Sequence, residues 1–222
     1  MALQEELEQQ GNYLFKYRGT LPLIILFVGI AVFGYESITG GGIQNENLIE
    51  PYKYLCLATS LFGLVIRVLT VGYTPKNTSG RNTESQLADV LNTTGIYSTV
   101  RHPLYVGNFF MWLGVGMFTQ NLWFIIAFTF IYWVYYERIM FAEEQFLRRK
   151  FGEEYLSWSQ NIPAFIPALK NWKSPSLCFS WKKVLRQEKN GLVAVFLILY
   201  LFDFVGVAIK TNSFSITYNF WF

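Results

Sequence analysis

Residues 103–140 read PLYVGNFFMWLGVGMFTQNLWFIIAFTFIYWVYYERIM. Two apolar runs lie in this string, Pro103 to Thr119 and Leu122 to Met140, and each is close to the ~20 residues that a helix needs to cross a bilayer. Only Gln120 and Asn121 separate them, and elements joined by so short a connection pack side by side. The string therefore predicts a tight hairpin of two antiparallel transmembrane helices.

The remainder of the chain is similarly apolar. Of its 222 residues, 52% are hydrophobic, 19% are aromatic and only 15% are charged, which is too apolar for an ordinary soluble domain of this length. Three further runs have the length of a membrane span: Leu21 to Ile38, Tyr54 to Tyr73 and Leu192 to Ile209. We therefore expect an all-α, polytopic integral membrane protein with about five transmembrane helices.

The Lys and Arg residues predict the orientation of these spans, because positive residues near span ends prefer the cytoplasmic side. With the N-terminus inside, only Lys53 and Lys210 of the 18 Lys and Arg residues fall on outer segments, and Arg67 falls within a span. This asymmetry predicts a cytoplasmic N-terminus, an outward C-terminus and a hairpin whose open end faces the cytoplasm. The basic residues flank spans and form no separate patch, so the net charge of +3 does not indicate a nucleic-acid partner.

Residue types that bind metals or form disulfides are scarce, with one His and two Cys in the chain. Cys56 falls in a span and Cys178 in a basic segment expected to face inward, and neither has neighbours at metal-ligand spacing. We therefore expect no metal site and no disulfide, with both thiols serving as packing or surface residues. The N-terminal segment carries three Glu residues before its first cation, unlike a secretory signal, so the first span is expected to be an uncleaved anchor.

The segment before the hairpin, residues 97–107, contains the only histidine. Pro103 suits the first turn of a helix, where its missing N–H is not needed. Arg101 and His102 would then lie beside the free N–H groups at the positive end of the helix dipole, a place that attracts a carboxylate or phosphate. A lone histidine is more often structural, but this location favours a functional site at Arg101 and His102.

The connection that leads into this segment, residues 74–100, is polar and long for a link between two spans. Its hydrogen-bonding side chains suit a polar ligand or a lipid headgroup, and a simple solvated loop is equally compatible with its composition. At its end, Ser98 or Thr99 is expected to cap the helix that starts at Pro103. Within that helix, Gly107 permits close approach of a neighbouring helix or ligand.

The second helix of the hairpin is expected to continue beyond the membrane, where it carries two adjacent carboxylates. Tyr136 and Glu143 are seven residues apart and share one helix face, which places an aromatic ring two turns from the Glu143 carboxylate. Such a carboxylate suits an ammonium group or two ribose hydroxyls of a cofactor, and the residues alone leave its role open. Glu144 is expected to pair with Arg148 at i+4, as on an ordinary solvated helix.

Five motifs in a fixed order carry a family resemblance: Gly95-Ile-Tyr97, Arg101-His-Pro-Leu-Tyr-Val-Gly107, Glu143-Glu144, Phe151-Gly-Glu-Glu-Tyr155 and Ile162-Pro-Ala-Phe-Ile-Pro167. They resemble the membrane-embedded methyltransferases related to isoprenylcysteine carboxyl methyltransferase and the phospholipid N-methyltransferases. The resemblance covers about Asp89 to Pro167. It implies that S-adenosylmethionine is held in a cytoplasmic-side pocket capped by the connecting segments, while a lipid or lipidated acceptor enters from the bilayer.

The resemblance also implies which residues bind the cofactor. Aligned on the motifs, these contacts fall on Asp89, Val90, Leu91, Asn92, Tyr97, His102, Pro103, Leu104, Tyr105 and Glu143. Backbone contacts are expected at residues 89–92, where the side-chain types differ from those usual in the family. His102 and Arg101 are the candidate catalytic residues.

One departure from the family concerns the acceptor. In the prenylcysteine enzymes an arginine four residues before the cofactor-binding glutamate engages the substrate, and Ile139 stands there in this chain. Arg138 is the candidate substrate-binding residue, although it points about 100° around the helix from that position. This departure argues against a prenylcysteine acceptor. Residues 77–83 and 91–95 are also similar to bacterial members that include a lipid A phosphate methyltransferase.

These inferences together predict three segments. Residues 1–73 hold the N-terminal segment and the first two spans, and residues 74–167 form the catalytic core. Residues 168–222 hold a linker, the last span and the tail, and the proline-rich stretch at 163–175 leads into this linker. The expected function is methyl transfer from S-adenosylmethionine to a lipid-borne carboxylate or phosphate, at the cytoplasmic face of a bacterial-type inner membrane.

The chemistry of methyl transfer suits such a site. Transfer from a sulfonium is an in-line displacement, in which alignment of donor and acceptor contributes on the order of 7 kcal/mol or more. The faces of Tyr97 or Tyr105 are suited to stabilise the sulfonium by about 1 kcal/mol. An anionic acceptor needs no general base, whereas an amine would require His102 or a glutamate to take a proton.

Two other functions remain open from the sequence. Membrane sterol reductases carry a similar Arg-His-Pro-x-Tyr element and use NADPH, although those chains are typically larger. A transporter or membrane scaffold is a non-enzymatic alternative, in which Arg67, Asp203 and the motif charges only pair with one another. Retention of labelled S-adenosylmethionine or of NADPH distinguishes these possibilities.

Overall fold

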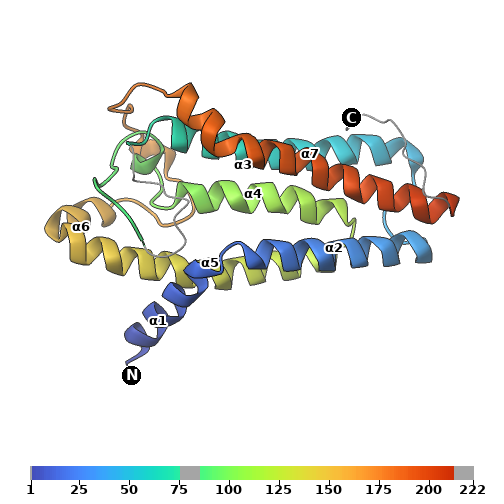
Figure 1. Cartoon of the computed structure of the whole chain (residues 1–222), viewed down its shortest axis with the longest axis horizontal. Coiled ribbons are helices and arrows are strands. Elements are labelled where there is room, and N and C mark those ends of the chain that lie inside the picture. The colour runs from blue at the N-terminus through green and yellow to red at the C-terminus, as the bar shows by residue number, and fades with distance from the viewer. Residues whose placement is uncertain (1, 76–85, 213–222) are drawn as a thin grey trace.

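The computed structural model of the protein describes residues 2–75 and 86–212, and the polar residues 77–83 singled out above lie outside the described residues. All regular secondary-structure elements in the described chain are helices (Figure 1). The α-helices are α1 (Leu3–Lys16), α2 (Thr20–Thr39), α3 (Glu46–Gly72), α4 (Pro103–Phe118), α5 (Leu122–Phe151), α6 (Glu153–Ser159) and α7 (Trp181–Thr211), with 3-10 turns η1 (Ile96–Ser98) and η2 (Leu169–Asn171).

The five predicted spans all correspond to apolar helices, which confirms an all-α polytopic membrane protein. Helices α2, α3, α5 and α7 are long and apolar enough to cross a membrane, judged by length and composition. Helix α4 is also apolar but has only 16 residues, or about 24 Å of helical rise. It is the shortest of the five and forms the hairpin with α5, whose helix begins directly after Asn121.

Helix boundaries differ from the apolar runs where polar residues extend a helix. Helix α3 begins at Glu46 because the Asn45 side chain accepts a hydrogen bond from the Asn47 N–H at 3.0 Å and caps the first turn. Helix α7 begins at Trp181, so its basic residues continue the same helix that enters the apolar run. Helix α1 has no counterpart among the predicted spans, and Phe15 is its buried large side chain.

The helices form a layered bundle with α4 at its centre. Figure 1 shows α4 between α3 and α7 on one side and α2 and α5 on the other. The starts of α2, α4 and α7 and the ends of α3 and α5 gather at one end of the bundle, together with α6 and η1. This end is where the candidate functional residues of the sequence meet, and it is called the site end below.

The contact between α3 and α4 is unusually close because glycines face each other. A Cβ on Gly107 would lie 2.6 Å from the Arg67 Cγ and 2.8 Å from the Gly63 carbonyl oxygen, so only hydrogen fits there. Further along, the Ser60 hydroxyl donates to the Met111 carbonyl at 2.9 Å. The prediction that Gly107 permits close approach of a neighbouring helix is confirmed, and this contact fixes Arg67 beside the first turns of α4.

Candidate functional site

The segment before α4 is held in place by the chain that follows α6. The backbone N–H groups of Arg101 and His102 donate to the carbonyl groups of Pro163 and Ala164 at 2.9 and 3.2 Å. Gly95 pairs with Lys173 in an isolated antiparallel bridge, with an N–H···O distance of 2.9 Å. The proline-rich stretch, interpreted as a separator before the last span, therefore also forms a backbone clamp on residues 95–102.

The expected cap of α4 is wrong. The Ser98 hydroxyl donates to the Gly95 carbonyl at 2.6 Å and accepts from the Lys173 N–H at 2.8 Å, while the Thr99 hydroxyl donates to the Ile96 carbonyl at 2.8 Å. Both side chains thus stabilise η1 and the clamp. His102 is the residue that precedes the helix, and no side chain caps it.

His102 lies between the two adjacent glutamates of α5. Its Nε2 is 3.0 Å from the Glu144 Oε1, and its Nδ1 is 3.5 Å from the Glu143 Oε2. The Arg101 Nε lies 3.3 Å from the same Glu144 oxygen. The predicted pairing of Glu144 with Arg148 is wrong, because the Glu144 carboxylate turns inward to the imidazole and the guanidinium. Residues 42 positions apart in the sequence therefore form one charged cluster.

The charge of His102 follows from this arrangement. Burial alone would lower the pKa of the imidazole, which is only 6% exposed, but the hydrogen bonds and charges of Glu143 and Glu144 outweigh burial and raise the pKa above 6.5. Both ring nitrogens face carboxylate oxygens, as suits an imidazolium ion in which both are donors. The two carboxylates therefore stabilise the protonated form of His102, and both of its ring nitrogens are engaged by them.

Aromatic side chains fix the Glu143 carboxylate from the membrane side. The Tyr105 hydroxyl donates to the Glu143 Oε1 at 2.7 Å, and the Tyr132 hydroxyl in turn donates to the Tyr105 carbonyl at 2.7 Å. The Tyr105 and Tyr136 rings lie with centroids 5.1 Å apart. Tyr136 and Glu143 line the same cavity, as their shared helix face predicted.

A cavity of about 490 Å³ opens beside this cluster and is called the first cavity. Every sequence-predicted site residue lines it except Asp89 and Arg138. Asp89 is exposed, while its neighbours Val90, Leu91 and Asn92 line the wall. The Arg138 side chain lies 3.3 Å from Glu137, on the part of α5 that α1 covers. Arg138 is thus not brought together with the other candidates.

Several residues of the first cavity were not singled out as site residues. Arg18, which precedes α2, and Arg67 of α3 add two cations, and Trp158 of α6 adds an indole. The Trp158 Nε1 is buried and makes no hydrogen bond in the described chain, whereas the buried Arg101 Nε lies 3.3 Å from the Glu144 Oε1. A buried donor without an acceptor is costly in a folded protein, so Trp158 indicates where a polar ligand is expected to bind. Only Arg67 had a sequence signal, as a lone charge within a membrane span.

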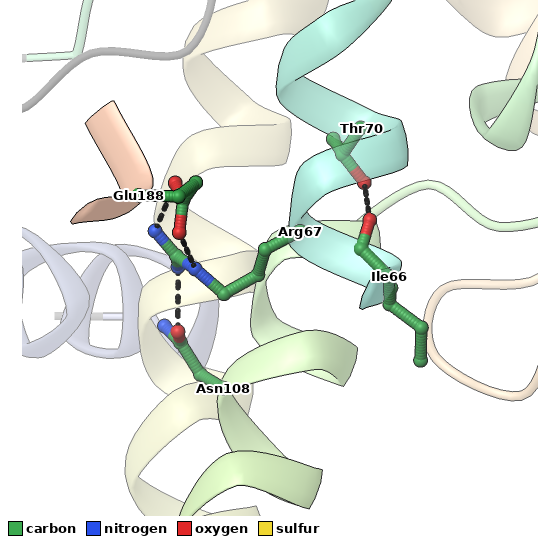
Figure 2. A network of polar contacts seen from close by, with 5 residues as sticks. All are labelled: Ile66, Arg67, Thr70, Asn108 and Glu188. Atoms are coloured by element: carbon green, nitrogen blue, oxygen red, sulfur yellow. Dashed lines mark hydrogen bonds and ion pairs between the residues drawn. The ribbon is translucent and has the colours of Figure 1, made fainter. Parts of the chain in front are cut away.

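Arg67, which lines this cavity, forms a network of polar contacts (Figure 2). Its Nε and Nη2 donate to the two carboxylate oxygens of Glu188 at 2.7 and 2.8 Å, and its Nη1 donates to the Asn108 Oδ1 at 2.6 Å. Asp203 instead pairs with Lys53 at 2.7 Å. The charges of the spans therefore form two separate pairs, and only the Arg67 pair borders the cavity.

Metal coordination has no candidate in the described residues 2–75 and 86–212. No group of three or more His, Cys, Asp or Glu side chains there is placed to hold a metal ion. The only His, His102, contacts two carboxylates. The cavity combines this acidic cluster with three arginines, an array suited to a ligand that carries both signs of charge.

Comparison with known proteins identifies relatives for the central part of the chain. Residues 54–154 match the family model of phospholipid methyltransferases. The protein-S-isoprenylcysteine O-methyltransferase of Tribolium castaneum is 33% identical over 84 residues, which is 38% of this chain and 30% of the relative. The corresponding enzyme of Saccharomyces cerevisiae is 31% identical over 142 residues, or 64% of this chain and 56% of the relative.

A third relative covers more of the chain. The cobalt-zinc-cadmium resistance protein CzcN of Cupriavidus metallidurans is 25% identical over 211 residues, 94% of this chain and 86% of the relative. In contrast, the matched part spans only 30 to 40% of the length of the first isoprenylcysteine methyltransferases. No solved structure is significantly similar to the chain.

Proposed function

We propose that the protein, whose residues 54–154 match the phospholipid methyltransferase family, is a membrane methyltransferase. We further propose that it uses S-adenosylmethionine and methylates a lipid-borne anionic group. The observation that carries the proposal is the convergence of His102, Glu143 and Tyr105 on one cavity at the site end. The relatives named for isoprenylcysteine methylation support the reaction class.

The residues of the first cavity fit the proposed cofactor. A volume of about 490 Å³ lies within the range of ~300–1,000 Å³ found for small-molecule sites. S-adenosylmethionine, when bound, supplies a methyl group on a positively charged sulfur. Glu143 is proposed to bind a hydroxyl or ammonium group of the cofactor, and the Trp158 N–H group offers a donor to its acceptors. Tyr97 and Tyr105 present aromatic faces suited to a cationic sulfur.

The proposed acceptor is a carboxylate or a phosphate because three cations line the cavity. Arg18, Arg67 and Arg101 line it. Both ring nitrogens of His102 face carboxylate oxygens, so the imidazole is poorly placed to remove a proton from an amine. An oxyanion attacks without losing a proton, and the residues around it need only to align it and to exclude water. His102 and Arg101 are accordingly proposed to position Glu143 and Glu144.

We place the proposed reaction at the cytoplasmic side of a bacterial-type inner membrane. Lys53 lies toward the opposite end of α3 from the site end, and Lys210 lies at the far end of α7. The basic residues at the end of α5, Arg148, Arg149 and Lys150, lie at the site end. This distribution supports the positive-inside orientation.

Cofactor binding and lipid methylation together test the proposal. Purified protein in lipid nanodiscs is titrated with S-adenosylmethionine and, separately, with NADPH by calorimetry. We expect saturable binding of S-adenosylmethionine only. Incubation with methyl-labelled cofactor and a bacterial lipid extract should then transfer label to a lipid that gains one CH2 unit in mass. Saturable binding of NADPH alone would indicate a reductase, and binding of neither cofactor would indicate a transporter or scaffold; either result would overturn the proposal.

A further inference from the structure

A second cavity of about 310 Å³ lies between α3, α4 and α7. Arg67, Asn108, Trp112, Gln187 and Glu188 line both this cavity and the first one. The hydrogen-bonded group of Arg67, Asn108 and Glu188, which Figure 2 shows, is therefore shared by the walls of the two cavities.

The second cavity is polar at one end and apolar beyond it. From Glu188 to Ile198 the wall follows α7 for ten residues, about 15 Å of helical rise, and from Asn108 to Val115 it follows α4 for about 10 Å. Both helices run away from the site end, so the apolar part extends into the membrane (Figure 1). This shape suits a molecule with a charged head at Arg67 and a hydrocarbon chain between α4 and α7.

The Arg67 guanidinium keeps binding capacity toward the cavities. An arginine side chain has five N–H donors, and three of them donate to Glu188 and Asn108 in the described chain. The two remaining N–H groups are on Nη1 and Nη2. The Arg67 side chain is 22% exposed whereas that of Glu188 is 4% exposed, and Arg67 lines both cavities. Its two remaining N–H groups are suited to donate to the oxygens of a carboxylate or phosphate.

We propose that Arg67 binds the anionic head of the lipid acceptor, while Glu188 and Asn108 hold its guanidinium and the second cavity takes the lipid chain. This inference rests on the proposed function and names the acceptor site. It also assigns the substrate-binding cation, because Arg138 lines neither cavity. A head bound at Arg67 would lie at the junction with the first cavity, which is where methyl transfer requires the acceptor to reach.

A structural ion pair is the alternative explanation, and the chain offers a matched control for it. Lys53 and Asp203 form another ion pair between α3 and α7, at 2.7 Å with side chains 17% and 14% exposed. This pair lines neither cavity. If membrane ion pairs act only on the packing of α3 and α7, changing either pair should have the same consequences.

The experiment compares Arg67→Gln/Glu188→Gln with Lys53→Gln/Asp203→Asn. Each double variant removes both charges, so neither leaves an unpaired buried charge. Binding is measured by native mass spectrometry in phosphatidylcholine nanodiscs, with phosphatidic acid as the phosphate probe, palmitate as the carboxylate probe and diacylglycerol as the neutral probe. Calorimetry gives the affinity for S-adenosylmethionine. Arg67→Lys is measured as well, in case the double variant does not fold. This substitution keeps the positive charge but removes the guanidinium N–H groups.

We expect wild-type protein and the Lys53/Asp203 variant to prefer one anionic probe over diacylglycerol, and the Arg67 variants to lose about tenfold or more of that affinity. Preference for phosphatidic acid would identify the acceptor head as a phosphate, and preference for palmitate would identify it as a carboxylate. A wild type without preference for either anion, an equal loss in both double variants, or a loss confined to S-adenosylmethionine would each overturn the inference. If anionic lipid binding depends on Arg67 but wild type binds no S-adenosylmethionine, the lipid site stands and the proposed function fails.

Discussion

The two adjacent glutamates of α5 should have different roles, and isosteric substitutions separate them. Glu143 lines the first cavity and accepts from Tyr105 at 2.7 Å. Glu144 does not line it and binds His102 at 3.0 Å and Arg101 at 3.3 Å. We therefore predict that Glu143→Gln weakens binding of S-adenosylmethionine, while Glu144→Gln mainly destabilises the fold.

The magnitudes follow from the contacts that each carboxylate makes. A hydrogen bond to a charged group contributes about 1.5–3 kcal/mol, so loss of the Glu143 charge should weaken cofactor binding about 10- to 150-fold. Glu144 is 14% exposed and partly neutralises His102 and Arg101. Its loss should cost about 1–3 kcal/mol of unfolding free energy, because two cations remain near each other with one carboxylate fewer.

The assay is calorimetric titration of S-adenosylmethionine into both variants in nanodiscs, with thermal unfolding of the same samples. Arg138→Gln is the control, because Arg138 is on the same helix but outside the cavity. The reasoning is refuted if Glu143→Gln and Glu144→Gln weaken cofactor binding equally at equal stability, or if Glu144→Gln has the larger effect on binding.

Three further predictions concern stability. The pKa of His102 is raised in the folded protein, so its contribution to stability is complete below pH 6.5 and is lost as the pH rises through the raised value; His102→Gln should remove this pH dependence of the unfolding temperature. Gly107→Val should cost about 1–3 kcal/mol, since its Cβ would meet the Gly63 carbonyl oxygen at 2.8 Å, and unchanged thermal unfolding would contradict that packing. Ser98→Ala removes the acceptor for the Lys173 N–H and should lower the unfolding free energy by about 1 kcal/mol, whereas no loss would show that the backbone bonds of the clamp suffice.

Membrane helices were predictable from the sequence because their signal is local. A run of apolar residues near the spanning length is nearly sufficient, and the two-residue link at Gln120 and Asn121 fixed the α4–α5 hairpin. The meeting of His102 with Glu143 follows from the same topology, since the start of one hairpin helix and the end of the other must share an end of the bundle. The sequence did not predict that the Glu143 carboxylate accepts a hydrogen bond from the Tyr105 hydroxyl.

The parts that were missed depend on contacts without a local pattern. Apart from the Ser98 hydroxyl, the clamp on residues 95–102 is made by backbone groups, which carry no residue preference. The i+4 rule favoured Arg148 for Glu144, but a desolvated imidazole and guanidinium nearby offer stronger partners than an exposed cation. Arg67 and Glu188 are 121 residues apart, and only the fold brings them together.

The glycine contact between α3 and α4 has a mechanical consequence. With bare backbone at Gly63 and Gly107, neither helix can slide along the other without driving a side chain into a carbonyl group, so the two behave as a single stiff block. At Gly191 of α7, by contrast, an added methyl group would meet only side-chain atoms at ordinary contact distances of 3.5 Å or more. A change in the width of the space beside Arg67 would therefore have to come from the α7 side, because the α3–α4 block keeps its shape.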